Sequence, residues 1–112
     1  MTKAQFETYL KFIPNNKNIK KFILEKCKIE FAHPLCSAQM IGHYVGFCET
    51  TQKHIIRFHS FNPRPFTFFH EIAHAFLNHR GAKYELWVKQ EREADSLASE
   101  WLNIKQEVLN EN

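Results

Sequence analysis

Residues 66–79 read FTFFHEIAHAFLNH and carry the clearest structural signal in the chain. An Asn-Pro-Arg-Pro segment at residues 62–65 precedes them and is typical of a helix start, because Asn62 can cap a helix and proline is tolerated in the first turn. Gly81 follows and is typical of a left-handed cap at a helix end. We therefore expect a helix over residues 66–79, and its nearly continuous apolar surface predicts a buried, central position.

Two histidines in this helix, His70 and His74, are four residues apart and flank Glu71. At about 100° per residue their rings lie about 40° apart on one face, a geometry suited to two nitrogen ligands of one zinc ion. Glu71 is displaced by one residue, so it can reach a metal-bound water without itself coordinating. Because these groups would be costly to bury unpaired, a metal ion also explains their presence on an apolar helix.

A second long helix is expected from about Tyr84 to Leu109, packed on the first through one apolar stripe. The stripe comprises Ala94, Leu97, Ala98, Trp101, Leu102, Val108 and Leu109. The sequence thus predicts two long helices in contact.

The second helix also offers a third metal ligand. Glu91 stands three residues before Ala94, near the inward stripe, and is predicted to bind the metal. Asp95 follows one turn later and is expected to accept the free N–H of a zinc-bound histidine, which would fix the tautomer of that ring. Glu93 points about 200° away from Glu91. It remains the alternative ligand, although its direction is more typical of a solvated charge.

The remaining histidines lack ligand spacing. His79 cannot complete the metzincin pattern, because that pattern requires Gly at position 77 and His at position 80, where this chain has Leu77 and Arg80. We expect His79 to interact with the C-terminal dipole of its helix. Surface or sheet positions are expected for the others, which are His33, His43, His54 and His59.

The rest of the chain predicts an α+β fold in a single domain over residues 1–112. Apolar residues near helical spacing indicate two short N-terminal helices, separated by Pro14-Asn15-Asn16. Between Cys36 and Phe58 the pattern alternates, which indicates a hairpin or the edge of a small antiparallel sheet. An extended substrate is expected to pair along an exposed strand near residues 54–58.

Composition narrows the class of protein. The chain has 112 residues, and no apolar stretch reaches the roughly 18 residues of a membrane span, so a cytoplasmic protein is expected. Cys27, Cys36 and Cys48 form no paired motif and are expected to be reduced packing residues. Residues 1–32 hold seven lysines against three glutamates, but no nucleic-acid-binding motif accompanies this charge, so direct nucleic-acid binding is not expected.

The ordered motifs resemble the ImmA/IrrE family of bacterial and phage zinc metallopeptidases. The resemblance covers about half the chain and rests on Gly46, Ile55-Ile56, the run from Arg64 to His74, and the run from Glu91 to Ala98. It implies a minimal zincin-like fold and a narrow substrate, a helix-turn-helix repressor of a mobile element or stress response. The segment after Ala98 departs from the family, because its Met-Pro end is missing.

By that resemblance His70, His74 and Glu91 are the zinc ligands and Glu71 is the catalytic carboxylate. The expected activity is therefore that of a zinc endopeptidase, in which Glu71 acts as general base. Manganese also accepts these ligands, although two histidines and one glutamate favour zinc. Two alternatives stay open: a metal-stabilised protein that binds a partner without cutting it, and a metal-free helical domain with the two histidines in its core.

Overall fold

Four helices and three strands form the part of the chain that the computed structural model describes, residues 1–11, 17–31, 41–59, 63–80 and 83–110. In chain order these elements are α1 (Lys3–Lys11), α2 (Lys17–Lys26), β1 (Cys27–Glu30), β2 (Gly42–Cys48), β3 (Lys53–Phe58), α3 (Pro65–Phe76) and α4 (Tyr84–Asn110). The α+β prediction is confirmed. Predictions for His33, Cys36, Asn62 and Gly81, and for the side chains of Val108 and Leu109, lie outside what the structure describes.

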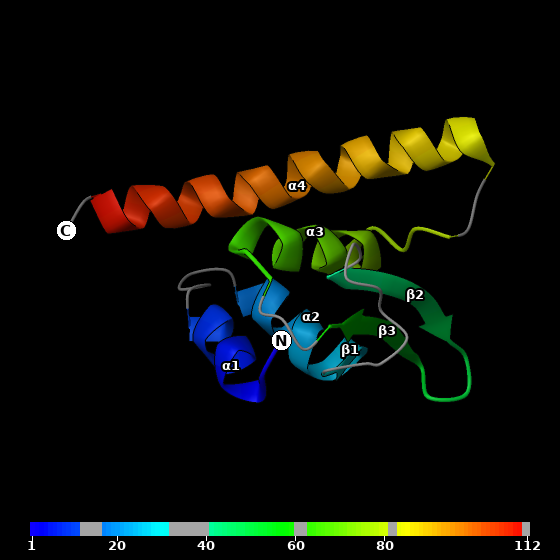
Figure 1. The fold of residues 1–112 in the computed structure, drawn as a ribbon, viewed down its shortest axis with the longest axis horizontal. Coiled ribbons are helices and arrows are strands. Elements are labelled where there is room, and N and C mark those ends of the chain that lie inside the picture. Colours follow the sequence, from blue (N-terminus) through cyan, green and yellow to red (C-terminus); the bar gives the residue numbers. More distant parts are fainter. Residues whose placement is uncertain (12–16, 32–40, 60–62, 81–82, 111–112) are drawn as a thin grey trace.

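The elements stack in layers, with α3 between α4 and the sheet (Figure 1). Helix α4 runs along one side of α3, while β2 and β3 pack on its other side. The helices α1 and α2 lie beside the sheet, below α3 in the view of Figure 1. Helix α3 is therefore central, as the sequence predicts, and both its faces meet protein.

The two N-terminal helices form as their apolar spacing predicts. Thr2 caps α1, since its side-chain oxygen accepts the backbone N–H of Gln5 at 3.1 Å. Ile19 and Ile23, one turn apart on α2, are both almost fully buried. Leu24, which follows Ile23 and points away from this stripe, is exposed. One apolar stripe per helix is therefore enough to attach these short helices to the core.

The predicted hairpin is formed by β2 and β3, which pair antiparallel. Inward and outward residues alternate along β3, and Ile56 and Phe58 are fully buried. Strand β1, which the sequence did not predict, pairs parallel with β3, so the sheet is mixed with the order β1-β3-β2. The expected pairing of a substrate along residues 54–58 is wrong, because β3 is the central strand and both its sides are occupied.

Helix α3 ends earlier than predicted, at Phe76 instead of about residue 79. Asn78 adopts a left-handed conformation with φ 54°. Asparagine tolerates this region better than other residues with side chains. The chain turns there, and the backbone N–H of His79 donates to the carbonyl of His74 at 3.0 Å. The stop is thus set by Asn78, before Gly81 is reached.

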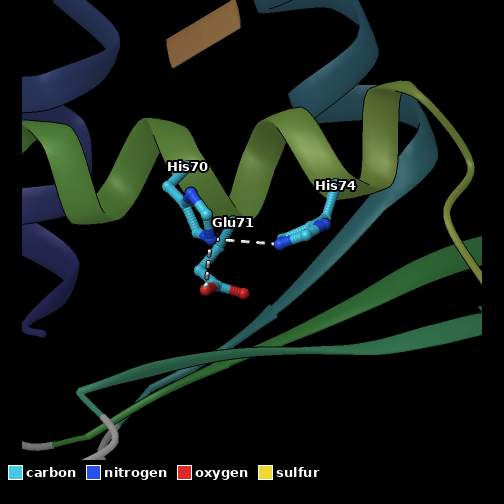
Figure 2. Close-up of side chains that lie close together, drawn as sticks. All are labelled: His70, Glu71 and His74. Atoms are coloured by element: carbon cyan, nitrogen blue, oxygen red, sulfur yellow. Dashed lines mark hydrogen bonds and ion pairs between the residues drawn. The ribbon is translucent and has the colours of Figure 1, made fainter. Parts of the chain in front are cut away.

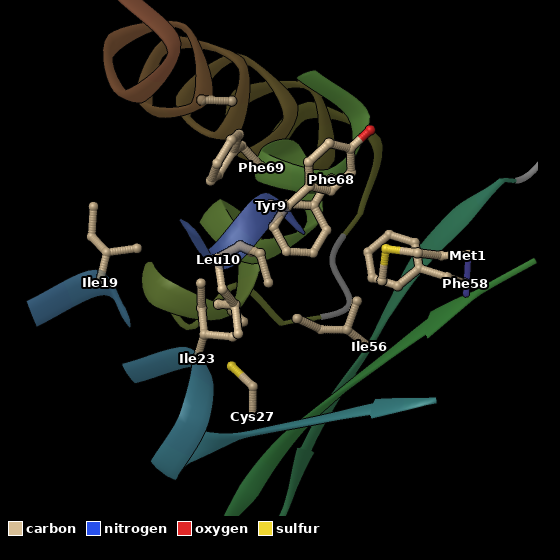
Figure 3. Close-up of a cluster of buried hydrophobic side chains, with 13 residues drawn as sticks. Met1, Tyr9, Leu10, Ile19, Ile23, Cys27, Ile56, Phe58, Phe68 and Phe69 are labelled. Atoms are coloured by element: carbon tan, nitrogen blue, oxygen red, sulfur yellow. The ribbon is translucent and has the colours of Figure 1, made fainter. Parts of the chain in front are cut away.

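The core lies where α3 meets the sheet and the N-terminal helices (Figure 3). Phe58 and Phe68 are fully buried and stack on each other, with ring centroids 5.7 Å apart. Helix α4 closes the other side of α3 through Ala94 and Ala98, which are both fully buried, and this confirms that part of the predicted stripe. Aromatic rings thus fill the sheet side of α3, whereas α4 packs on α3 through small residues and through Trp101, whose ring contacts Phe69 and Phe76.

Two further expectations concern cysteines and membranes. Cys27 is buried in the core, as expected for a packing residue, while Cys48 is half-buried at the end of β2. Both are free thiols. Within the described ranges, no helix is both long enough and apolar enough to cross a bilayer.

Candidate metal centre

His70 and His74 point from the same face of α3 into one space (Figure 2). Their Nε2 atoms are 3.0 Å apart. The side chains are 14% and 9% exposed, so both rings are largely removed from water. The spacing of four residues therefore brings two imidazole nitrogens together, as predicted from the motif.

Glu91 reaches these nitrogens from α4. Its two carboxylate oxygens lie 3.1 Å from Nε2 of His70 and 3.0 Å from Nε2 of His74. Glu93, the alternative in the sequence, points elsewhere, and its carboxylate lies 3.6 Å from Nε2 of His79. The structure thus brings Glu91, and not Glu93, to the histidine pair.

The donor atoms fit a zinc ion. Ligands that surround a tetrahedral zinc ion at about 2.0–2.1 Å stand about 3.3 Å from one another. Nε2 of His70 and Nε2 of His74 are 3.0 Å apart, and each lies at a similar distance from a different oxygen of Glu91, 3.1 Å from Oε2 and 3.0 Å from Oε1. Two imidazoles and one carboxylate are also a ligand set that zinc prefers, and they leave a fourth position for water.

Glu71 lies beside His70, His74 and Glu91, but its carboxylate is farther from the histidine nitrogens than that of Glu91. Its carboxylate is 3.9 Å from Nε2 of His70, and its oxygen, with the two histidine nitrogens, falls in a group spanning no more than 4.8 Å. Burial raises the pKa of Glu71 to about 7, and the charge of Glu91 adds to this, whereas His70 and a hydrogen bond from the Tyr44 backbone lower it. A carboxylate with such a pKa is suited to accept and release protons near neutral pH.

His74 is held neutral. Burial is the main cause that lowers its pKa to about 4, and the neighbouring imidazoles of His70, His79 and His43 lower it further. A metal ligand must be deprotonated, so this environment prepares the imidazole for coordination at neutral pH.

The carboxylate of Asp95 lies 2.8 Å from Nδ1 of His70, the neighbour that the sequence predicts. The contact is poorly aligned, since Nδ1 of His70 has no well-directed hydrogen bond among the described residues. Asp95 is half-exposed, whereas the ring of His70 is largely buried. Asp95 therefore lies at hydrogen-bonding distance from His70, as predicted, but the angle between the two groups is not that of a hydrogen bond.

His79 makes a contact that the sequence did not predict. It lies just past the end of α3, where a partner of the helix dipole is expected, is 9% exposed, and places Nδ1 at 2.8 Å from Nδ1 of His74. Sequence reasoning missed this contact because it depends on the turn at Asn78. The sequence signal that could have revealed the contact is Asn78, because asparagine adopts the left-handed conformation readily and stands here between His74 and His79.

A cavity of about 460 Å³ opens beside the cluster. Glu71, His74 and Glu91 line one side, β2 lines another, and Arg80 and Trp87 also contribute. Such a concave site with converging polar groups is where a substrate would be expected to bind.

Two residues of β2 that the sequence analysis did not select contact the residues of the candidate metal centre. The ring of Tyr44 stacks on His74 with an interplanar angle of 5°, and its hydroxyl is 2.8 Å from Nδ1 of His54. Gly42 leaves room for Glu71, because a Cβ atom there would stand 3.1 Å from Cγ of Glu71 and 2.9 Å from the ring of Phe58. His54 is therefore a partner of Tyr44 in the sheet and not a metal ligand.

Comparisons with known proteins identify neither a family nor a function for this chain. No family model, no curated protein and no solved structure matches this chain. The resemblance to the ImmA/IrrE family therefore rests on the sequence motifs, and the site is assigned from its own geometry.

Proposed function

We propose that this protein is a zinc-dependent endopeptidase. The observation that carries the proposal is the convergence of His70, His74 and Glu91 within about 3 Å, next to the buried carboxylate of Glu71 and an open cavity. A structural zinc site is closed by four protein ligands, whereas the three ligands found among the described residues leave a position for water, as in catalytic sites.

Each residue has a defined task in this proposal. His70, His74 and Glu91 hold the ion, which when bound supplies a Lewis acid for water and for a peptide carbonyl. Glu71 accepts the proton of the attacking water and passes it to the leaving amine. Its pKa of about 7 allows both steps near neutral pH.

The substrate is proposed to be a protein segment in extended form. Among the described strands, β2 is paired on one side only and lines the cavity, so its free edge can hydrogen-bond a peptide beside Glu71. The family resemblance supports a helix-turn-helix repressor as the natural substrate. Pairing at the edge of β2 replaces the expectation of pairing along β3, which is the central strand.

The first test is the zinc content of the purified protein. We expect about one zinc per chain, and a sharp loss in Glu91→Ala. Glu100→Ala is the matched control, because Glu100 is an exposed glutamate on the same helix. Absence of metal from the natural, folded protein would overturn the proposal and favour a metal-free domain.

The second test separates cleavage from binding. Glu71→Gln should keep zinc and lose cleavage of a quenched peptide library by about 10²-fold or more, while Glu100→Gln should cleave normally. Retained cleavage in Glu71→Gln would contradict the role of general base. If the zinc-loaded natural protein cuts none of the library and holds a repressor intact in a stable complex, the non-cleaving binding protein would be favoured.

A further inference from the structure

His79 is a buried histidine that the proposed chemistry does not use. The turn at Asn78 brings it back along α3, where its backbone N–H donates to the carbonyl of His74. Its ring lies across that of His74, with centroids 5.0 Å apart and an interplanar angle of 67°. Both the backbone and the side chain of His79 are thus attached to one residue of the candidate metal centre.

The contact between the two rings requires one particular placement of protons. Nδ1 of His74 and Nδ1 of His79 are 2.8 Å apart, so one nitrogen must donate and the other accept. Nε2 of His74 faces Glu91 and His70 and must be free of hydrogen to bind a metal. Nδ1 of His74 therefore carries the hydrogen, and Nδ1 of His79 accepts it.

This placement also defines the other end of His79. If its Nδ1 accepts, its Nε2 carries a hydrogen. This Nε2 is buried without a hydrogen-bond partner among the described residues, and the carboxylate of Glu93 lies 3.6 Å away. If the carboxylate of Glu93 came slightly closer, it would accept the hydrogen of His79 Nε2. Hydrogen bonds would then connect His74, His79 and Glu93 in series.

We propose that His79 is a positioning residue, which fixes the tautomer and ring orientation of His74 for metal binding, with Glu93 supporting the same tautomer of His79. The inference rests on the proposed function, because it assigns a role toward the metal. The role also explains why a polar ring is buried at the end of α3, where an apolar side chain would need no hydrogen-bond partner. His70 has a different neighbour, Asp95, whose carboxylate lies 2.8 Å from Nδ1 of His70.

Two variants with the same side-chain branching at Cγ separate hydrogen bonding from packing. In His79→Asn the side-chain oxygen takes the place of Nδ1 and can still accept from His74, whereas His79→Leu has no acceptor. We expect zinc affinity, measured by competition with a chromogenic chelator, to fall 10- to 100-fold in His79→Leu. His79→Asn should stay close to the natural protein. The visible spectrum of bound Co²⁺ should change in the leucine variant alone.

The outcomes distinguish this inference from the proposed function. Equal zinc affinity in all three proteins, or an equal loss in both variants, would overturn the positioning role while leaving the metal centre intact. Absence of zinc binding by the natural protein would remove the metal centre itself and the inference with it. If His79→Leu fails to fold, His79→Gln replaces it, because its oxygen extends one bond too far and should not rescue affinity.

Discussion

At the scale of single residues, burial decides which protonation state a side chain holds. Glu71 and His74 are neighbours on α3, yet burial raises the pKa of the first to about 7 and lowers that of the second to about 4. Both shifts disfavour the charged form, because the site is withdrawn from water. The same surroundings thus produce an acceptor for protons and a neutral ligand for a metal.

Cys27 provides a test of burial away from the site. Burial raises the pKa of its thiol from 9.0 to about 12. Below pH 9 the thiol is protonated in both folded and unfolded chains, so the stability it contributes is fully present. Above pH 9 the unfolded chain loses the proton first, and the free energy of unfolding should fall by up to about 1.4 kcal/mol per pH unit until about pH 12.

The measurement is urea unfolding between pH 8 and pH 11 for the natural protein and for Cys27→Ala. The variant starts from a lower stability because it loses buried volume, but the part of the decline that comes from Cys27 should be absent. Other groups that titrate in this range are common to both proteins. A parallel decline of the two curves would show that Cys27 is not the group responsible.

At the scale of elements, alanines control the distance between α3 and α4. Ala73 on α3, and Ala94 and Ala98 on α4, are all fully buried. Small side chains let two helices approach closely, and that approach brings Glu91 to the histidines of α3. The position of Glu91 relative to His70 and His74 therefore depends on how α3 and α4 pack at the buried alanines.

We expect Ala98→Leu to weaken both the fold and the metal site. A larger side chain in a packed position costs about 1–3 kcal/mol and pushes the helices apart. Glu91, about two turns away, would then move from His70 and His74, and zinc affinity should fall. Urea unfolding and chelator competition measure the two effects. Ser99→Leu, an exposed neighbour on α4, should change neither, and a normal zinc affinity in Ala98→Leu would contradict this coupling.

Elements with a long apolar pattern could be predicted from the sequence, and short or distant contacts could not. The two long helices and the hairpin follow from periodicity, and the position of Glu91 follows from the stripe on α4. Strand β1 has only four residues, and its partner β3 lies far along the chain, so no local pattern reveals it. The contact of His79 with His74 was missed for a similar reason, because one left-handed residue, Asn78, creates it.

At the scale of the whole molecule, distant segments hold the site in place. Tyr9 of α1 donates its hydroxyl hydrogen to the carbonyl of Pro63, just before α3, and the N-terminal amine of Met1 donates to the carbonyl of His59. The N-terminal region therefore binds the backbone at His59, just after β3, and at Pro63, just before α3. On the opposite side of α3, α4 supplies Glu91 and Asp95. The candidate metal centre thus stands where two layers of the fold meet.

A metal ion at that junction should stabilise the molecule as a whole, because its ligands come from α3 and α4. Binding to the folded state alone adds about 4 kcal/mol when free zinc is 1,000 times the dissociation constant. For a domain of this size we expect a rise in Tm on the order of 15 °C over the metal-free protein. Calorimetry with zinc and with excess chelator measures this difference directly.

The variants determine whether the added stability comes from this junction. His74→Ala and Glu91→Ala should each lose most of the rise, since each removes a ligand from one of the two helices, whereas Glu100→Ala should respond to zinc like the natural protein. If the rise in Tm persists in both ligand variants, the ion binds elsewhere on the chain. If it persists only in Glu91→Ala, the two histidines of α3 bind the metal without help from α4, and zinc does not join the two helices.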